Sequence, residues 1–163
     1  MAWIISRGPV GVQPITETST TQRHPLGMRV LAIDPTYGQG EFIYLTGLAA
    51  TGVGDWVTYL PDDWTTVKLI ADARGPVAVA MSANVASQYG WYQIFGKVSA
   101  GNCLTAFADN GRVFCTASAG YIDDASVTGD LVTNAIGAST STARTAEFEI
   151  FYPYVDDASS TLA

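Results

Sequence analysis

The chain has 163 residues, of which 48% are hydrophobic and 14% charged, so it is long enough to bury the core of one domain and too apolar for disorder along its whole length. Its formal net charge of −7, from 15 acidic and 8 basic residues without a basic run, argues against nucleic acid as a partner. No stretch reaches the roughly 18 consecutive apolar residues of a membrane helix, and the first residues lack the basic region of a signal peptide, so no membrane partner is expected.

Residues 1–28 are predicted to form an extended N-terminal arm. Two glycines and two prolines between positions 8 and 14 block a helix, and a polar, β-branched run follows them. Such a segment has no amphipathic period of its own, so it is either a mobile leader or an arm that lies on a neighbouring subunit. In the second case its apolar side chains would alternate against the neighbour and its arginines would meet acidic groups. The partner-binding candidates in the arm are Arg7, Val10, Val12, Ile15 and Arg23.

From residue 29 onward, short runs of β-branched and aromatic residues alternate with turn signals. A turn every 8 to 12 residues or so is typical of sandwiches and barrels. We therefore predict an all-β fold, a single-domain β-sandwich or barrel of short strands over residues 29–155, with an exposed tail at 156–163. The expected strands are 29–34, 41–48, 55–60, 65–70, 77–81, 91–98, 104–108, 112–117, 121–125, 131–138 and 147–152.

The stretch 77–89 fits two patterns. Its valines alternate as in a strand, but Ala78, Met81, Val85 and Tyr89 also fall on one helical face. The alternation favours a strand over 77–81, with room for one helical turn after it.

Two cysteines, Cys103 and Cys115, flank the turn signal Asn110-Gly111. If that dipeptide closes a hairpin, Cys103 faces Ser118 instead of Cys115, and the two sulfurs are several residues out of register. The spacing therefore favours two free, buried thiols over a disulfide.

Catalytic and metal-binding motifs are missing from the sequence. Its only histidine, His24, lies in the proline-flanked arm, where a catalytic triad would lack the preorganisation that it needs. Neither a nucleophile elbow nor a phosphate-binding glycine motif occurs. The paired aspartates at 62–63, 123–124 and 156–157 fit solvated turns. We expect no enzymatic activity, no catalytic residues, no metal and no cofactor.

Aromatic residues gather over 89–95. Trp91 and Phe95 would face one side of a strand there, and Tyr92 the other, so the strand must be covered on both sides. A place in the core is the first interpretation, a subunit interface the second and a sugar-binding platform the third. Trp91 and Tyr92 are therefore added to the partner-binding candidates.

Several runs taken together resemble small virion proteins of tailed bacteriophages, in particular head decoration or cement proteins. The resemblance covers roughly residues 21–155 and contains no catalytic motif. The residues that carry it are Thr21-Gln22-Arg23-His24-Pro25-Leu26-Gly27, Asp34-Pro35, Tyr37-Gly38, Gly40-Glu41-Phe42-Ile43-Tyr44-Leu45, Gly75-Pro76-Val77-Ala78-Val79-Ala80, Tyr89-Gly90-Trp91-Tyr92-Gln93-Ile94, Gly129-Asp130, Gly137 and the final run from Ala146 to Tyr154.

The resemblance implies a β-rich, non-enzymatic structural protein of the virion, made in the host bacterial cytoplasm and located on the capsid exterior. Its partners would be the major capsid protein and further copies of itself, as a dimer or trimer. A tail or head-fibre component, with or without a glycan-binding surface, is the alternative, because such proteins share this composition. A small hydrolase is the third and least favoured hypothesis.

Overall fold

The computed structural model describes residues 3–157, which form twelve β-strands and no helix. The all-β prediction is confirmed. The strands belong to one antiparallel sheet that does not close, so the domain is sandwich-like and the barrel alternative is wrong. The strands are β1 (Ile4–Arg7), β2 (Thr18–Ser19), β3 (Arg29–Asp34), β4 (Gly38–Thr46), β5 (Trp56–Tyr59), β6 (Thr66–Lys68), β7 (Arg74–Ala80), β8 (Tyr89–Asn102), β9 (Arg112–Cys115), β10 (Ile122–Asp123), β11 (Leu131–Gly137) and β12 (Thr145–Asp156).

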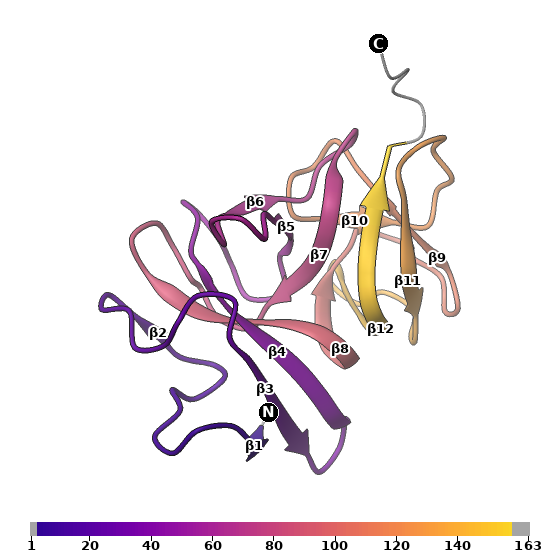
Figure 1. Ribbon diagram of the computed structural model, residues 1–163. Coiled ribbons are helices and arrows are strands. Elements are labelled where there is room, and N and C mark those ends of the chain that lie inside the picture. Colours follow the sequence, from indigo (N-terminus) through magenta and orange to yellow (C-terminus); the bar gives the residue numbers. More distant parts are fainter. Residues whose placement is uncertain (1–2, 158–163) are drawn as a thin grey trace.

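The sheet follows the order β1-β3-β4-β8-β7-β12-β11-β9-β10, and β8 is its central element. One edge of β8 pairs with β4. Its other edge pairs in turn with β2, β7 and β12. The sheet therefore branches beside β8, and in Figure 1 the β1–β3–β4 end lies at the lower centre of the view and the β9–β11–β12 end at its right.

Both faces of β8 are covered, as the alternation of its aromatic residues predicts. Trp91 packs in a cluster with Phe42 and Tyr44, whereas Tyr92 and Ile94 pack in a second cluster on the other face. Because Trp91 and Tyr92 are both 0% exposed, the hypothesis that they bind a partner is wrong. A third cluster fills the β9–β12 end around Trp56 and Phe148.

The N-terminal segment lies against its own sheet, which differs from both expected alternatives, a mobile leader and an arm on a neighbouring subunit. Ile15 is 2% exposed and belongs to the cluster around Trp91. The Trp91 Nε1–H donates a hydrogen bond to the backbone carbonyl of Gln13 at 2.9 Å, and the backbone amide of Gln13 donates one to Nε2 of His24 at 3.0 Å. The segment docks because this side of β3, β4 and β8 presents apolar side chains that residues 12–15 cover.

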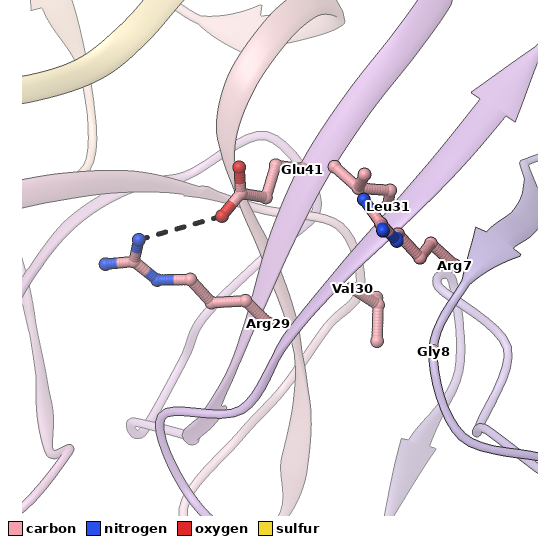
Figure 2. A pocket seen from close by; sticks show the side chains of 6 residues that line it. All are labelled: Arg7, Gly8, Arg29, Val30, Leu31 and Glu41. Carbon is pink, nitrogen blue, oxygen red and sulfur yellow. Dashed lines mark ion pairs between the residues drawn. The ribbon is translucent and has the colours of Figure 1, made fainter.

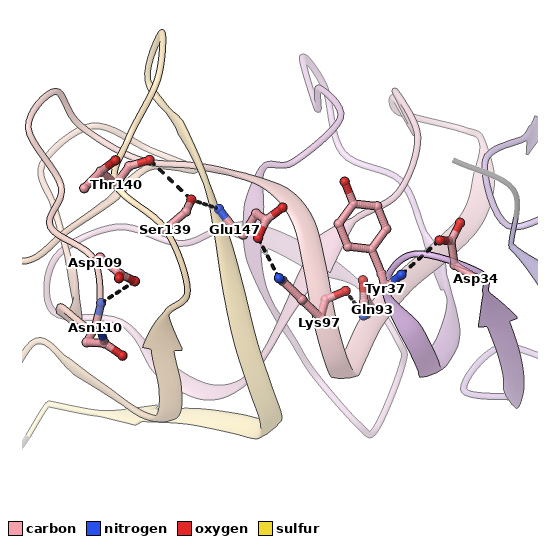
Figure 3. Close-up of polar contacts among 9 residues, drawn as sticks. All are labelled: Asp34, Tyr37, Gln93, Lys97, Asp109, Asn110, Ser139, Thr140 and Glu147. Atoms are coloured by element: carbon pink, nitrogen blue, oxygen red, sulfur yellow. Dashed lines mark hydrogen bonds and ion pairs between the residues drawn. The ribbon is translucent and has the colours of Figure 1, made fainter.

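Turn chemistry accounts for the local boundaries. Asp34 accepts hydrogen bonds from the amides of Thr36 and Tyr37 and so closes the β3–β4 turn. Asn110 has a φ of 58°, as the turn signal requires. Figure 3 shows both turns, together with the ion pair that joins Lys97 of β8 to Glu147 at 2.7 Å.

Three local predictions are wrong. Residues 104–108 form no strand, because β9 pairs with β10 and β11 and leaves no edge for a hairpin partner. The stretch after Met81 contains bends and turns, and no helical turn. The last strand continues to Asp156, and Asp157 is only 6% exposed, so the exposed tail does not begin at 156. Residues 158–163 of that predicted tail lie outside the described residues.

Both cysteines are free and buried, which confirms the prediction made for them. The two cysteines are not held apart by the expected hairpin. The backbone of Cys103 instead forms an isolated β-bridge with Ile122, at the start of β10. Burial raises the pKa of Cys103 to about 11 and that of Cys115 to about 12.

Candidate functional site

The first candidate is the outer edge of β1, which we call the N-terminal edge and define as Ile4, Arg7, Val10 and Ile33. Within residues 3–157, strand β1 ends the sheet and pairs with β3 alone, so one row of its backbone groups faces away from the sheet. Ile4 and Ile33 are cross-strand partners, 65% and 46% exposed. Val10, in the loop after β1, is fully exposed. The edge therefore combines free backbone groups with apolar side chains.

A shallow depression of about 290 Å³ lies inside this edge, between β1, β3 and β4. Figure 2 shows Arg7 and Arg29 entering it from different strands, with Arg29 reaching toward Glu41. The Nη1 of Arg29 lies 3.7 Å from Oε1 of Glu41, and the Arg29 side chain is 54% exposed. The two guanidinium groups give the lining a local positive balance in a chain of net charge −7.

A second hollow, which we call the tyrosine groove, has a volume of about 320 Å³ and shares Arg29 with the depression. Four strands, β3, β5, β7 and β12, contribute to it. Tyr152 and Tyr154 are 48% and 46% exposed, the largest exposed rings along this wall. The groove is lined by Arg29, Tyr59, Pro76, Tyr152, Pro153 and Tyr154.

A bulge in β12 creates the groove. The strand pairs with β8 through Phe151 and with β7 from Tyr154 onward, so it changes partners between these residues. Its pairing with β11 also shifts there. Between two successive paired positions, β11 advances by two residues while β12 advances by four. Two successive side chains, Phe151 and Tyr152, consequently both reach solvent.

Tyr152 adopts a φ of 53°, in the left-handed region that costs a non-glycine residue on the order of 1 kcal/mol or more. Its ring centroid lies 5.4 Å from that of Phe95, and the guanidinium carbon of Arg29 lies 5.9 Å above it. The Tyr152 hydroxyl donates a hydrogen bond to Glu41. That bond, with a smaller contribution from burial, raises the pKa of Tyr152.

The structure separates the predicted arm residues. Arg7, Val10 and Arg23 are exposed, Val12 is half-buried against the Trp91 cluster, and Ile15 is buried. Ile15 therefore cannot face a neighbouring subunit, because it is part of the domain's own core.

Sequence reasoning missed the tyrosine groove, although one signal for it was present. A proline inside a strand is confined to edges and bulges, and Pro153 stands between two tyrosines. The strand ladder does break there, and Pro153 itself is buried while both neighbours are exposed. Tyr-Pro-Tyr within a β-rich run thus indicated a bulge with outward-facing rings.

His24 has a structural position. It packs against the rings of Tyr44 and Trp91, with centroid distances of 5.1 and 5.7 Å, and its Nε2 accepts a hydrogen bond from the backbone amide of Gln13. Burial and, to a smaller extent, the nearby charge of Arg23 lower its pKa. The buried carboxylate of Asp55 lies 2.9 Å from Nζ of Lys68 and accepts a hydrogen bond from Asn102 at 2.7 Å.

Across residues 3–157, no group of three or more His, Cys, Asp or Glu side chains is placed to hold a metal ion. The same part of the chain has no helix long and apolar enough to cross a membrane. No family model, curated protein or solved structure matches the chain.

Proposed function

We propose that this chain is a non-enzymatic structural protein of a bacteriophage virion, which binds the capsid exterior and stabilises it. Two things support the proposal: the sequence resemblance to head decoration proteins, and the N-terminal edge. The edge is the single observation that carries it. Soluble proteins normally cover or charge such an edge, because an open strand pairs readily with other chains.

The major capsid protein is the proposed partner at this edge. An extended segment of a capsid subunit would pair with the outer row of backbone groups on β1, as in β-strand addition. Ile4 and Ile33 lie side by side on one face, so a capsid segment that pairs with β1 and also extends over this face would bury both. Burial of a previously exposed isoleucine contributes about 1.5–3 kcal/mol.

Self-association as a dimer or trimer belongs to the same proposal. Two or three linked copies on neighbouring capsid sites would gain from effective concentration, so a modest contact in each copy is sufficient. Arg7, next to the edge, adds an exposed charge whose contribution falls as salt screens it.

Co-sedimentation with purified, expanded heads that lack tails tests the proposal. Wild-type protein is expected to pellet with the heads and to saturate at a fixed copy number. The double substitution Ile4→Lys and Ile33→Lys should weaken binding at least tenfold, because it places charge on the contact. Val67→Lys, at a β6 position that is 53% exposed, is the matched control and should bind like wild type.

A wild-type protein that stays in the supernatant at all salt concentrations would overturn the proposal. Equal binding by the double variant would overturn the role of the edge.

The alternative is a tail or head-fibre component with a glycan-binding surface. The tyrosine groove favours it, because it presents exposed rings beside a guanidinium group. Gold-labelled antibody on intact virions distinguishes the two locations, since label over the head supports decoration and label on the tail or on fibres supports the alternative.

A further inference from the structure

We propose that the tyrosine groove binds an acidic saccharide, with a sugar ring against Tyr152 and Tyr154 and its carboxylate on Arg29. The proposal deepens the glycan-binding alternative by naming the site and the ligand class. It does not depend on capsid binding, which involves the N-terminal edge.

The two tyrosines form a fixed aromatic wall. They stand two residues apart on β12, on either side of Pro153, and both line the groove. Pro153 between them is buried, and the strand is paired before and after the bulge. Phe95 lies against Tyr152 from below. Rings held in this way lose little entropy when a ligand stacks on them.

Polar groups with the geometry for sugar hydroxyls and carboxylates converge on the same wall. Arg29 carries five N–H donors, and among the described residues its ion pair with Glu41 is a single contact of 3.7 Å. More than half of its side chain remains exposed, so donors are free to hold a carboxylate in a forked pair. Glu41 also accepts a hydrogen bond from the Tyr152 hydroxyl, and the guanidinium group of Arg29 lies over the Tyr152 ring.

The charge pattern selects an acidic ligand over a neutral one. Arg29 is shared between the groove and the depression that Arg7 also lines. Glu41 is the only acidic residue that lines either hollow, and it is 15% exposed and already paired. A carboxylate entering the groove therefore meets the guanidinium group of Arg29, and among residues 3–157 no acidic residue lines the groove itself.

The strain at Tyr152 points the same way. A left-handed tyrosine in a strand persists only where its surroundings enforce it, and such positions concentrate at ligand sites. The groove volume of about 320 Å³ lies at the small end of the range for ligand pockets, roughly 300–1,000 Å³, which suits a short saccharide.

Calorimetric titration of the full chain tests the proposal with two acidic probes, trigalacturonate and 3′-sialyllactose, and two neutral ones, maltotriose and lactose. At least one acidic probe is expected to bind tenfold or more tightly than its neutral counterpart. Tyr154→Ala and Arg29→Gln should each weaken that binding at least tenfold. Phe151→Leu is the matched control, because Phe151 is equally exposed on the same strand but does not line the groove.

Three results would overturn the proposal: no binding of either acidic probe, equal binding of acidic and neutral probes, or binding that both groove variants retain. Co-sedimentation with heads separates this failure from failure of the proposed function. If Tyr154→Ala and Arg29→Gln abolish head binding while no saccharide binds, the groove is a protein contact and the saccharide proposal is wrong. If heads bind normally and the probes do not, capsid binding stands without the saccharide site.

Discussion

Two pairs of aromatic residues in this sheet differ in their exposure to solvent. Trp91 and Tyr92, on β8, are fully buried, whereas Tyr152 and Tyr154, on β12, are about half exposed. Strand β8 has partners on both edges and a hydrophobic cluster on each face, so residues 90–94 are all buried. Strand β12 changes partners at the bulge, and the rings of Tyr152 and Tyr154 remain partly exposed to solvent.

The electrostatics of the two pairs differ for the same reason. Burial raises the pKa of Tyr92 to about 12, and its hydroxyl accepts from Asn84. The pKa of Tyr152 is raised mainly by the hydrogen bond to Glu41, a neighbour at the surface. Position in the sheet, and not residue type, therefore decides which aromatic residues stabilise the fold and which are available to a ligand.

Replacement of a buried ring should have the largest effect. Trp91→Ala removes a fully buried side chain and the hydrogen bond to Gln13, so we expect a loss of about 3–5 kcal/mol in the free energy of unfolding. Tyr154→Ala, at the exposed position, should cost less than about 1 kcal/mol. Urea denaturation followed by circular dichroism measures both, and equal losses would contradict the comparison.

Ile15→Ala extends the comparison to the N-terminal segment. Because Ile15 is 2% exposed beside Trp91, its truncation should cost about 2–4 kcal/mol in the same urea assay. Val10→Ala, in the same segment but fully exposed, is the control and should leave the unfolding midpoint unchanged. A mobile segment would instead make the two substitutions equally harmless.

The same segment should respond weakly to pH through His24. Because the pKa of His24 is lowered in the folded protein, the unfolded chain takes up the proton at a higher pH than the folded protein does. The stability that is present above the unfolded pKa of about 6.5 is therefore lost as the pH falls through the folded pKa. Protonation also removes the acceptor of the Gln13 amide, a bond worth about 1 kcal/mol.

Unfolding midpoints at pH 7.5 and pH 5 should therefore differ more for wild type than for His24→Gln, which removes the titrating group. An identical pH dependence of the two proteins would show that His24 does not link the segment to pH.

The two thiols provide the smallest test of burial. With pKa values raised to about 11 and 12, Cys103 and Cys115 should react with a disulfide reagent at pH 8 only on the timescale of opening. Both should react at once in denaturant without reductant. Fast labelling of the native protein would mean that the β9–β12 end opens more readily than its packing indicates.

Local pattern was sufficient for much of the fold. The strand 29–34 has the predicted bounds, and the alternation over 91–94 correctly placed side chains on two covered faces. It failed where contacts are long-range. The pairing of Thr18 with Gly90, which ties the N-terminal segment to β8, leaves no periodic trace in either stretch. Asn110-Gly111 forms the expected turn, but its hairpin partner was wrong because β9 pairs elsewhere.

The candidate surfaces were predicted less well. Of the seven partner-binding candidates, Arg7 and Val10 lie at the N-terminal edge, while Trp91, Tyr92 and Ile15 belong to the core. The exposure of Tyr152 depends on a bulge set by three strands, β7, β8 and β11, so its own sequence neighbours could not reveal the groove.

Electron cryomicroscopy of expanded heads decorated with this protein tests the central claim most directly. The account predicts that density from a capsid subunit runs along the free edge of β1 at the spacing of a paired strand, about 4.8 Å, and covers Ile4 and Ile33. A decorated head in which β1 faces solvent, with the contact made by another surface, would contradict it.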